Sequence, residues 1–122
     1  MTVRLKTLLL LRHAKSSWAE SDLDDHERPL NERGARDAPR MGDLVRDLRL
    51  LPDVIISSDA ERARVTAETL AKTAHFAGKI LLDPRLYLAS PDSIIAVVQT
   101  VADANAQSVM VVGHNPGLEG LI

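Results

Sequence analysis

Three short apolar runs stand out along the chain, and each has the length and composition of a β-strand. These runs are Thr7–Leu11, Val54–Ile56 and Val109–Val112, with a weaker fourth candidate at Lys79–Leu82. Continuous apolar runs of this length are typical of strands buried on both faces, and β-branched residues in the second and third favour a strand further. The pattern therefore predicts a sheet that is covered on both sides.

Apolar residues at helical spacing fill the segments between these runs. Asn31 can cap a first helix, although Pro39 inside it should kink that helix or mark its true start. Ser58 and Glu61 have the capping-box spacing for a second helix. Ser90, followed by a proline, supplies the start of a third. The apolar positions of the three helices include Ala35, Ala38, Met41, Leu44, Val45 and Leu48, then Ala63, Ala67, Leu70 and Ala71, then Ile94, Ile95, Val98 and Val101.

Strands and helices alternate along the chain, and this order predicts an α/β domain with a mostly parallel sheet. Helices on both faces of such a sheet give a three-layer α/β/α arrangement. The polar stretch Ser16–Pro29 contains a run of acids and is predicted to be a long loop. Loops of this length in compact domains are often functional.

The composition fits one soluble globular domain and excludes several classes of function. The chain has 122 residues, of which 45% are hydrophobic and 26% are charged. A formal net charge of −2 gives no basic field to attract nucleic acid, and the absence of cysteine excludes disulfides, thiolate catalysis and cysteine-bound zinc. The run Leu8–Leu11 is too short to cross a membrane and makes a poor signal peptide, so we expect a cytoplasmic protein without a membrane partner.

Polar clusters follow three of the predicted strands. Arg12-His13 comes directly after the first strand, Ser57-Ser58 after the second, and the segment 113–115, which contains His114, after the last. In open parallel sheets, ligands bind outside the carboxyl ends of the strands. We therefore expect these clusters to meet at one edge of the sheet.

Arginines and histidines at such an edge favour phosphoryl transfer. Guanidinium groups bind phosphoryl oxygens in bidentate fashion, and Arg12, Arg28 and Arg62 could form such a clamp. A neutral His13, with its pKa lowered by the arginines, could attack phosphorus through a ring nitrogen and form a covalent phosphohistidine. His114 could donate to the phosphoryl oxygens as charge develops on them.

Each of these residues also has a simple structural interpretation. His13 could be a hydrogen-bonded residue at a strand end, and His114 could belong to a turn. Arg62 could pair with a nearby acid, and Arg28 could be a solvated loop charge. Four such residues would rarely meet at one sheet edge by chance, so a shared site is the better explanation.

No metal site is predicted. The four histidines are scattered, none at the i, i+4 spacing of a helical zinc site, and the chain carries neither an acidic magnesium signature nor a P-loop. His26 and His75 are interpreted as structural or surface residues.

Four motifs resemble those of the histidine phosphatase superfamily, which shares its fold with the phosphoglycerate mutases. Leu11–Trp18 resembles the opening Arg-His-Gly motif, and Asp25–Gly34 looks like the Arg-Pro-Leu segment of the SixA-like phosphohistidine phosphatase branch. Ser57–Ala67 resembles the second-arginine motif, and Val111–Gly117 the second-histidine motif. The motifs occur in the family's order and are specific together, so the resemblance implies a phosphoglycerate mutase-like fold.

The resemblance also implies six site residues and neither a metal nor a cofactor. They are a nucleophile, three phosphate-binding arginines, a second histidine that completes the pocket, and a small polar residue that can touch the phosphate. In that order these are His13, then Arg12, Arg28 and Arg62, then His114, and finally Ser16.

One departure from the family bears on the substrate, whereas Ala14 in place of the usual glycine is common in the SixA-like branch. Many members carry a glutamate as proton donor just after the third strand, where this chain has no carboxylate in residues 86–89. Losing that acid should slow ester cleavage by about 10² to 10⁴, because a leaving alkoxide needs a proton. The leaving nitrogen of phosphohistidine has a near-neutral pKa and can take its proton from solvent. The departure favours phosphohistidine or another labile phosphoryl donor, with Glu119, Asp24 or Asp25 as alternative acids.

We therefore expect a metal-independent hydrolase that removes phosphate from phosphohistidine in a partner protein. The alternatives are a phosphomonoesterase that acts on small phosphate esters and a non-catalytic phosphate-binding module. The first lacks a proton donor, and the second has no need of a nucleophile. The resemblance assigns residues 1–122 to one histidine phosphatase domain that lacks the last helix and edge strand of the family. The sequence leaves the oligomeric state open.

Overall fold

The computed structural model describes residues 7–20, 22–102 and 106–122. Its strands are β1 (Thr7–Arg12), β2 (Val54–Ser57), β3 (Ile80–Leu82) and β4 (Ser108–Gly113). Its helices are α1 (Glu32–Asp47), α2 (Glu61–Thr73) and α3 (Pro91–Ala102). Short 3₁₀ turns occupy Asp25–Glu27, Pro84–Leu86 and Glu119–Leu121.

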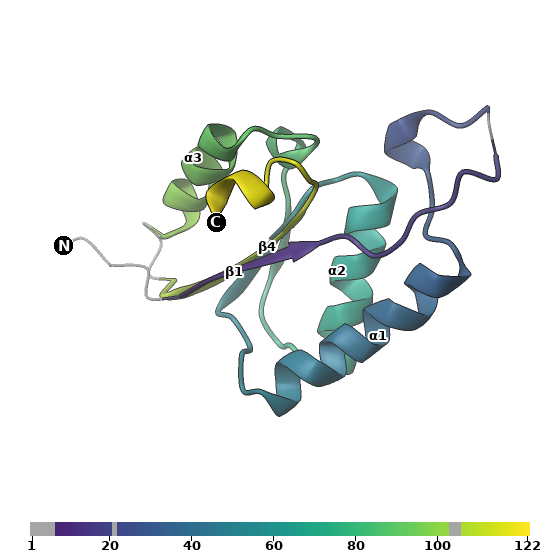
Figure 1. Ribbon diagram of the computed structural model, residues 1–122. Coiled ribbons are helices and arrows are strands. Elements are labelled where there is room, and N and C mark those ends of the chain that lie inside the picture. Colours follow the sequence, from purple (N-terminus) through teal and green to yellow (C-terminus); the bar gives the residue numbers. More distant parts are fainter. Residues whose placement is uncertain (1–6, 21, 103–105) are drawn as a thin grey trace.

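The four strands pair in parallel, in the order β1-β4-β2-β3. The last strand of the sequence, β4, therefore lies between β1 and β2, and Figure 1 shows it alongside β1. This order places the carboxyl ends of β1 and β2 on either side of the carboxyl end of β4. The predicted parallel sheet and its fourth strand are confirmed.

Helices cover both faces of the sheet. On one face, α1 and α2 pack over a core that includes Ile55 and Val112, and on the other face α3 packs over a core that includes Ile56 and Val111. Figure 1 shows α3 on one side of the strands and α1 and α2 on the other. Neighbouring residues of one strand enter opposite cores because successive strand side chains point to opposite faces. The predicted three-layer α/β/α arrangement is confirmed.

The prediction that β1 is buried on both faces is wrong. The interiors of β2 and β4 are fully buried, whereas β1 is at most half-buried and Leu8 is 39% exposed. The physical reason is its place in the sheet, because β1 pairs with β4 and forms an edge among the described strands. Its apolar residues still contact both cores, with Leu10 on one face and Leu9 and Leu11 on the other.

The predicted starts of α1 and α3 are confirmed. The Asn31 side chain accepts the Gly34 N–H at 2.8 Å, and the Ser90 hydroxyl accepts the Ser93 N–H at 3.2 Å. The helix α1 runs through Pro39, so this proline does not mark its beginning.

The capping box predicted at Ser58 and Glu61 is wrong. The helix α2 begins at Glu61 after Ala60, and no side chain caps it. The Ser58 hydroxyl instead accepts the Ala60 N–H at 3.2 Å and shares a hydrogen bond of 2.8 Å with Nε2 of His114. The Ser58 hydroxyl, which the capping box would place at the start of α2, therefore bonds to the buried His114.

The polar loop between β1 and α1 is fastened where it leaves and rejoins the body of the protein. The Ser17 N–H donates to the carbonyl of Pro29 at 2.8 Å, and the Asn31 N–H donates to the carbonyl of Lys15 at 2.9 Å. This loop carries Arg28 to the carboxyl end of the sheet. In the described part of the chain, no helix combines the length and the apolar character that crossing a bilayer requires.

Candidate active site

The register of the sheet brings the three polar clusters together. Arg12 pairs with Gly113, and the N–H of His13 donates to the Gly113 carbonyl at 3.0 Å. On the other side of β4, the N–H of Ser58 donates to the carbonyl of Val112 at 2.9 Å. The first residues after β1, β2 and β4 therefore lie next to one another, as the position of the clusters predicts.

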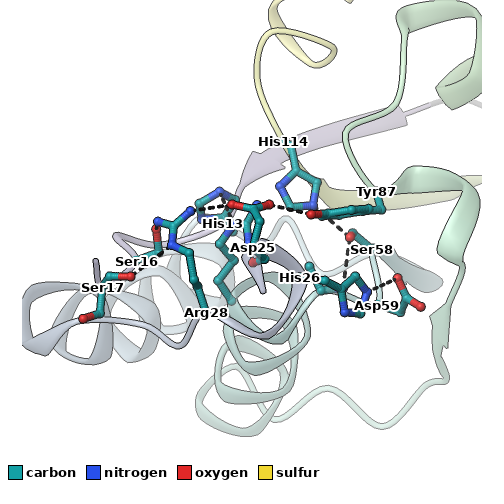
Figure 2. Close-up of polar contacts among 12 residues, drawn as sticks. His13, Ser16, Ser17, Asp25, His26, Arg28, Ser58, Asp59, Tyr87 and His114 are labelled. Carbon is teal, nitrogen blue, oxygen red and sulfur yellow. Dashed lines mark hydrogen bonds and ion pairs between the residues drawn. The ribbon is translucent and has the colours of Figure 1, made fainter. Parts of the chain in front are cut away.

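A polar cleft of about 230 Å³ opens at this edge. It contains all six residues that the sequence singles out, together with four others. The cleft is lined by Arg12, His13, Lys15, Ser16, Trp18, Arg28, Arg62, Leu88, His114 and Asn115. Figure 2 shows His13, Arg28 and His114 gathered around the cleft.

His13 is held in one tautomer. Its Nδ1 lies 2.7 Å from the carbonyl oxygen of Ala14, and a carbonyl can only accept, so Nδ1 carries the hydrogen. The lone pair of the neutral ring is therefore on Nε2. The guanidinium Nε of Arg62 lies 3.4 Å from this atom. The ring nitrogen of His13 that carries the lone pair thus lies beside an arginine of the cleft.

His13 is also kept neutral by its surroundings. Burial lowers the pKa of His13 below its usual value, and the positive charges of Arg62, Arg12 and Arg28 lower it further, while the hydrogen bond to Ala14 opposes them. The arginines act in the predicted direction, but burial is the larger cause. A neutral imidazole is the nucleophilic form.

His114 lies beside His13, with the two ring centroids 5.1 Å apart. It is 3% exposed, and burial is the main reason that its pKa falls to about 4. Its Nε2 bonds with Ser58, whereas its buried Nδ1 has no hydrogen-bond partner among the described residues. An unpaired buried nitrogen is costly, and a ligand oxygen in the cleft would satisfy it.

Arg28 is a buried residue and not a solvated loop charge. Its Nε donates to the carbonyl of Ser17 at 3.0 Å, and its Nη2 donates to the hydroxyl of Ser16 at 2.5 Å. Its guanidinium carbon lies 3.2 Å from the ring centre of Trp18, a stacking contact that fixes the plane of the group. Ser16 is thus placed to orient Arg28 at the rim of the cleft.

Arg62 enters the cleft from the first turn of α2. It is 3% exposed, and its outer nitrogens donate to one residue of the polar loop, Asp25, at 2.5 Å to the main-chain oxygen and 2.9 Å to the carboxylate. The neighbouring Arg12, in contrast, is exposed and makes no side-chain hydrogen bond to any described residue. The three predicted arginines therefore line one cleft, and residues of the polar loop orient two of them, Arg28 and Arg62.

Asp25 and Tyr87 belong to the site, although the sequence singles out Asp25 only as a possible acid and does not single out Tyr87. The Tyr87 hydroxyl donates to the Asp25 carboxylate at 2.5 Å, and the Tyr87 ring meets His114 edge to face at 5.5 Å. Figure 2 shows the Asp25 carboxylate joined to the Tyr87 hydroxyl beside His114. The two residues are 62 positions apart in the chain, and no motif joins them. The only signal was the acidity of the loop.

None of the three candidate proton donors, Glu119, Asp24 and Asp25, provides an acid next to His13. The exposed Glu119 accepts a hydrogen bond from Asn115 at 3.0 Å and does not line the cleft. Asp24 is exposed and makes no side-chain hydrogen bond to a described residue. Asp25 is an anion, because the hydrogen bond from Tyr87 and those from Arg28 and Arg62 hold its pKa well below the usual range.

His26 has a structural partner, in line with its interpretation as a structural or surface residue. Its Nε2 lies 2.9 Å from the carboxylate of Asp59, and its ring packs edge to face against Tyr87 at 4.8 Å. His75 is exposed. Over residues 7–20, 22–102 and 106–122, no group of three or more His, Asp or Glu side chains is placed to hold a metal ion.

Comparison with known proteins decides the family. The family model described as histidine phosphatase superfamily (branch 1) matches residues 8–87. The chain belongs to the histidine phosphatase superfamily. Among its relatives in this superfamily, an uncharacterized chloroplastic protein of Arabidopsis thaliana is 34% identical over 93% of this chain and 56% of the relative. The chain thus spans little more than half the length of that relative.

Solved structures place the chain near the SixA-like branch of the histidine phosphatases. A candidate phosphohistidine phosphatase SixA from Agrobacterium tumefaciens is 36% identical, with a TM-score of 0.84 over 98% of this chain and 73% of that one. A second candidate SixA, from Nakamurella multipartitia, is 32% identical, with a TM-score of 0.81 over 99% of this chain and 64% of that one. The predicted phosphoglycerate mutase-like fold is confirmed.

Proposed function

We propose that this histidine phosphatase removes phosphate from phosphohistidine in a protein, with His13 as the nucleophile and without a metal. The observation that carries the proposal is the hydrogen bond from Nδ1 of His13 to Ala14, which leaves a neutral Nε2 beside Arg62 in the polar cleft. A nitrogen lone pair surrounded by guanidinium groups is suited to attack on a phosphoryl group, because these groups can bind the phosphoryl oxygens.

The reaction has two steps. In the first, Nε2 of His13 bonds to phosphorus while the bond from phosphorus to the substrate nitrogen breaks and its electron pair goes to that nitrogen. In the second, water attacks phosphorus, the bond to Nε2 breaks, and inorganic phosphate leaves. Arg12, Arg28 and Arg62 bind the phosphoryl oxygens, and His114, neutral above about pH 4, donates to one of them through its unpaired Nδ1.

Two observations support a nitrogen-linked substrate. First, none of the carboxylates considered as proton donors is a neutral acid next to His13, and a leaving imidazole has less need of one than a leaving alkoxide. Second, two solved structures that are similar to this chain carry the name of a candidate phosphohistidine phosphatase. A protein-bound substrate fits the open rim, where Trp18 is 76% exposed and Leu88 is 58% exposed.

The test compares two substrates and two matched variants. Purified protein is incubated with a phosphohistidine-bearing phosphocarrier protein and with p-nitrophenyl phosphate, with and without EDTA. We expect hydrolysis of the phosphocarrier that EDTA does not reduce, that His13→Ala abolishes, and that replacement of the exposed His75 by alanine leaves intact. Full activity of His13→Ala would remove the nucleophile assignment. A much higher kcat/KM for p-nitrophenyl phosphate would favour the phosphomonoesterase, and activity on neither substrate would favour a phosphate-binding module.

A further inference from the structure

A carboxylate joins the two buried arginines of the cleft. Oδ1 of Asp25 accepts from Nη1 of Arg28 at 2.7 Å, and Oδ2 accepts from Nη2 of Arg62 at 2.9 Å. Oδ2 also accepts the Tyr87 hydroxyl at 2.5 Å. Figure 2 shows this carboxylate between Arg28 and Tyr87. The negative charge is therefore fixed by three partners directly beside the groups that bind phosphate.

The carboxylate lies at the far end of Arg62 from the nucleophile. Arg62 directs its Nε toward Nε2 of His13, at 3.4 Å, and its two outer nitrogens toward Asp25. Attack on phosphorus proceeds with the incoming and departing atoms roughly in line. A phosphoryl group attacked by Nε2 of His13 would therefore direct its departing group away from His13, and Asp25 lies at the opposite end of the Arg62 guanidinium from His13.

Asp25 can still accept another hydrogen bond. A carboxylate offers about four acceptor positions, and the contacts given above use three of them. Its side chain is 41% exposed, so a substrate group can reach it. An ionised carboxylate accepts hydrogen bonds and does not donate them, so Asp25 is suited to hold a proton-bearing group on the substrate.

The charge of the departing group differs between the two classes of phosphate compound. A phosphohistidine that is protonated on its second ring nitrogen carries a positive charge and leaves as neutral imidazole, because the electron pair of the P–N bond cancels that charge. A phosphate ester leaves as an alkoxide or phenoxide and gains negative charge as its P–O bond breaks. A carboxylate held in place stabilises the positively charged phosphohistidine. It repels the negative charge that develops on a departing alkoxide or phenoxide.

We propose that Asp25 is a specificity-determining residue that selects phosphoramidates over phosphate esters by accepting the N–H of the protonated phosphohistidine ring, which departs as neutral imidazole. This proposal rests on the proposed function, because it names the residue that sets the substrate class of the same site. Arg28, Arg62 and Tyr87 hold the carboxylate in place for this role.

The test measures a ratio of activities. Asp25→Asn keeps the shape of the side chain and removes its charge, and Glu27→Gln removes an exposed charge from the same 3₁₀ turn as the control. For each protein, kcat/KM is measured with a phosphohistidine-bearing phosphocarrier protein and with phenyl phosphate. We expect Asp25→Asn to lower the ratio of the first to the second by about 10- to 100-fold, the usual effect of one hydrogen bond to a charged group. Glu27→Gln should leave the ratio unchanged.

Equal loss of both activities in Asp25→Asn, complete loss included, would overturn the proposal and leave Asp25 as a residue that only orients the arginines. The inhibition constant of inorganic phosphate separates these effects, since damage to the clamp weakens phosphate binding whichever substrate is used. Tyr87→Phe provides a second variant, which keeps the charge but removes one of its three bonds, and it should lower the same ratio by a smaller factor. If the wild type did not cleave phosphohistidine but did cleave phenyl phosphate, the proposed function itself would fail, an outcome visible before any Asp25 variant is made.

Discussion

His13 donates its Nδ1 hydrogen to the carbonyl of its neighbour Ala14 over 2.7 Å. This bond connects residues that are adjacent in sequence, so it depends only on the backbone conformation directly after β1. It assigns the hydrogen to one ring nitrogen and the lone pair to the other. The hydrogen bond therefore leaves Nε2 as the ring nitrogen with the lone pair that the proposed attack on phosphorus requires, even without bound substrate.

The covalent intermediate should therefore carry phosphorus on Nε2 of His13. Rapid acid-free quenching during turnover of a phosphohistidine substrate should trap a phosphoprotein that is stable in base and labile in acid. Phosphorus-coupled NMR or mass spectrometry of the labelled peptide distinguishes the two ring positions. A phosphoryl group on Nδ1, or on another residue, would contradict the tautomer assignment.

Replacing Ser58 by alanine should weaken phosphate binding. The change leaves Nε2 of His114 and the Ala60 N–H without their common partner, and an unpaired buried group costs about 1 to 3 kcal/mol. We expect the inhibition constant of phosphate to rise by about 10-fold. Ser57→Ala is the matched control, because Ser57 is equally buried but donates to the Ser58 carbonyl and does not touch His114. Equal effects of the two variants on phosphate inhibition would show that the contact with His114 is unimportant.

Acid should destabilise the protein partly through His114. Its pKa is lowered from 6.5 to about 4 in the folded protein, mainly by burial. Between these values the unfolded chain binds a proton that the folded protein does not, so the free energy of unfolding falls as pH falls. The loss is about 1.4 kcal/mol per pH unit for one such proton. Below about pH 4 both states are protonated, and this contribution stops changing.

Urea denaturation at pH 7 and pH 4.5 measures this effect. His114→Gln should lose less stability between the two pH values than the wild type, whereas replacement of the exposed His75 by glutamine should lose as much as the wild type. An unchanged pH dependence in His114→Gln would mean that His114 takes up its proton equally readily in the folded and unfolded protein.

Gly34→Ala should perturb the loop that follows His13. A Cβ at Gly34 would lie 2.1 Å from the carbonyl oxygen of Lys15, so the two backbones must separate. Overpacking of this kind costs roughly 1 to 3 kcal/mol, and the shift should also reduce phosphatase activity. Gly113→Ala is the stability control, since its added Cβ would have no neighbour nearer than 3.8 Å in Leu118. Unfolding by urea and phosphate inhibition of both variants check the prediction, and wild-type stability of Gly34→Ala would contradict it.

Trp18 should report directly on the occupancy of the cleft. It is the single tryptophan of the chain, and it stacks on Arg28 at 3.2 Å. Vanadate or phosphate bound to that guanidinium should change the tryptophan fluorescence in a saturable way. Trp18→Ala should weaken phosphate binding by about 2- to 5-fold, the usual range for a partly exposed stacking contact. A fluorescence response that persists in Arg28→Gln would show that it arises elsewhere.

The strand ends of the site could be predicted because a parallel sheet imposes a simple rule. Residues directly after β1 and β4 must meet if the strands pair, which places His13 beside His114 without any knowledge of side chains. Arg28 could be predicted only through its motif, because its path through the loop depends on bonds to Ser16 and Ser17 that no periodicity records.

Two parts of the structure could not be predicted from the sequence, for different reasons. The start of α2 was misplaced because a serine hydroxyl can serve a helix or a buried histidine, and only the tertiary structure decides which. The sequence offers Asp25 only as a possible acid and gives no role to Tyr87, because their contact joins a loop to the segment after β3, and nothing local in either stretch signals the other.

The insertion of β4 between β1 and β2 has a consequence for how the protein matures. His13 follows β1, the first of the four described strands along the chain, and His114 follows β4, the last of these four. A nascent chain that lacks β4 therefore lacks both His114 and the strand that joins β1 to β2, so the cleft cannot form. Recovery of phosphate binding after denaturation should report the insertion of β4 between its two neighbours.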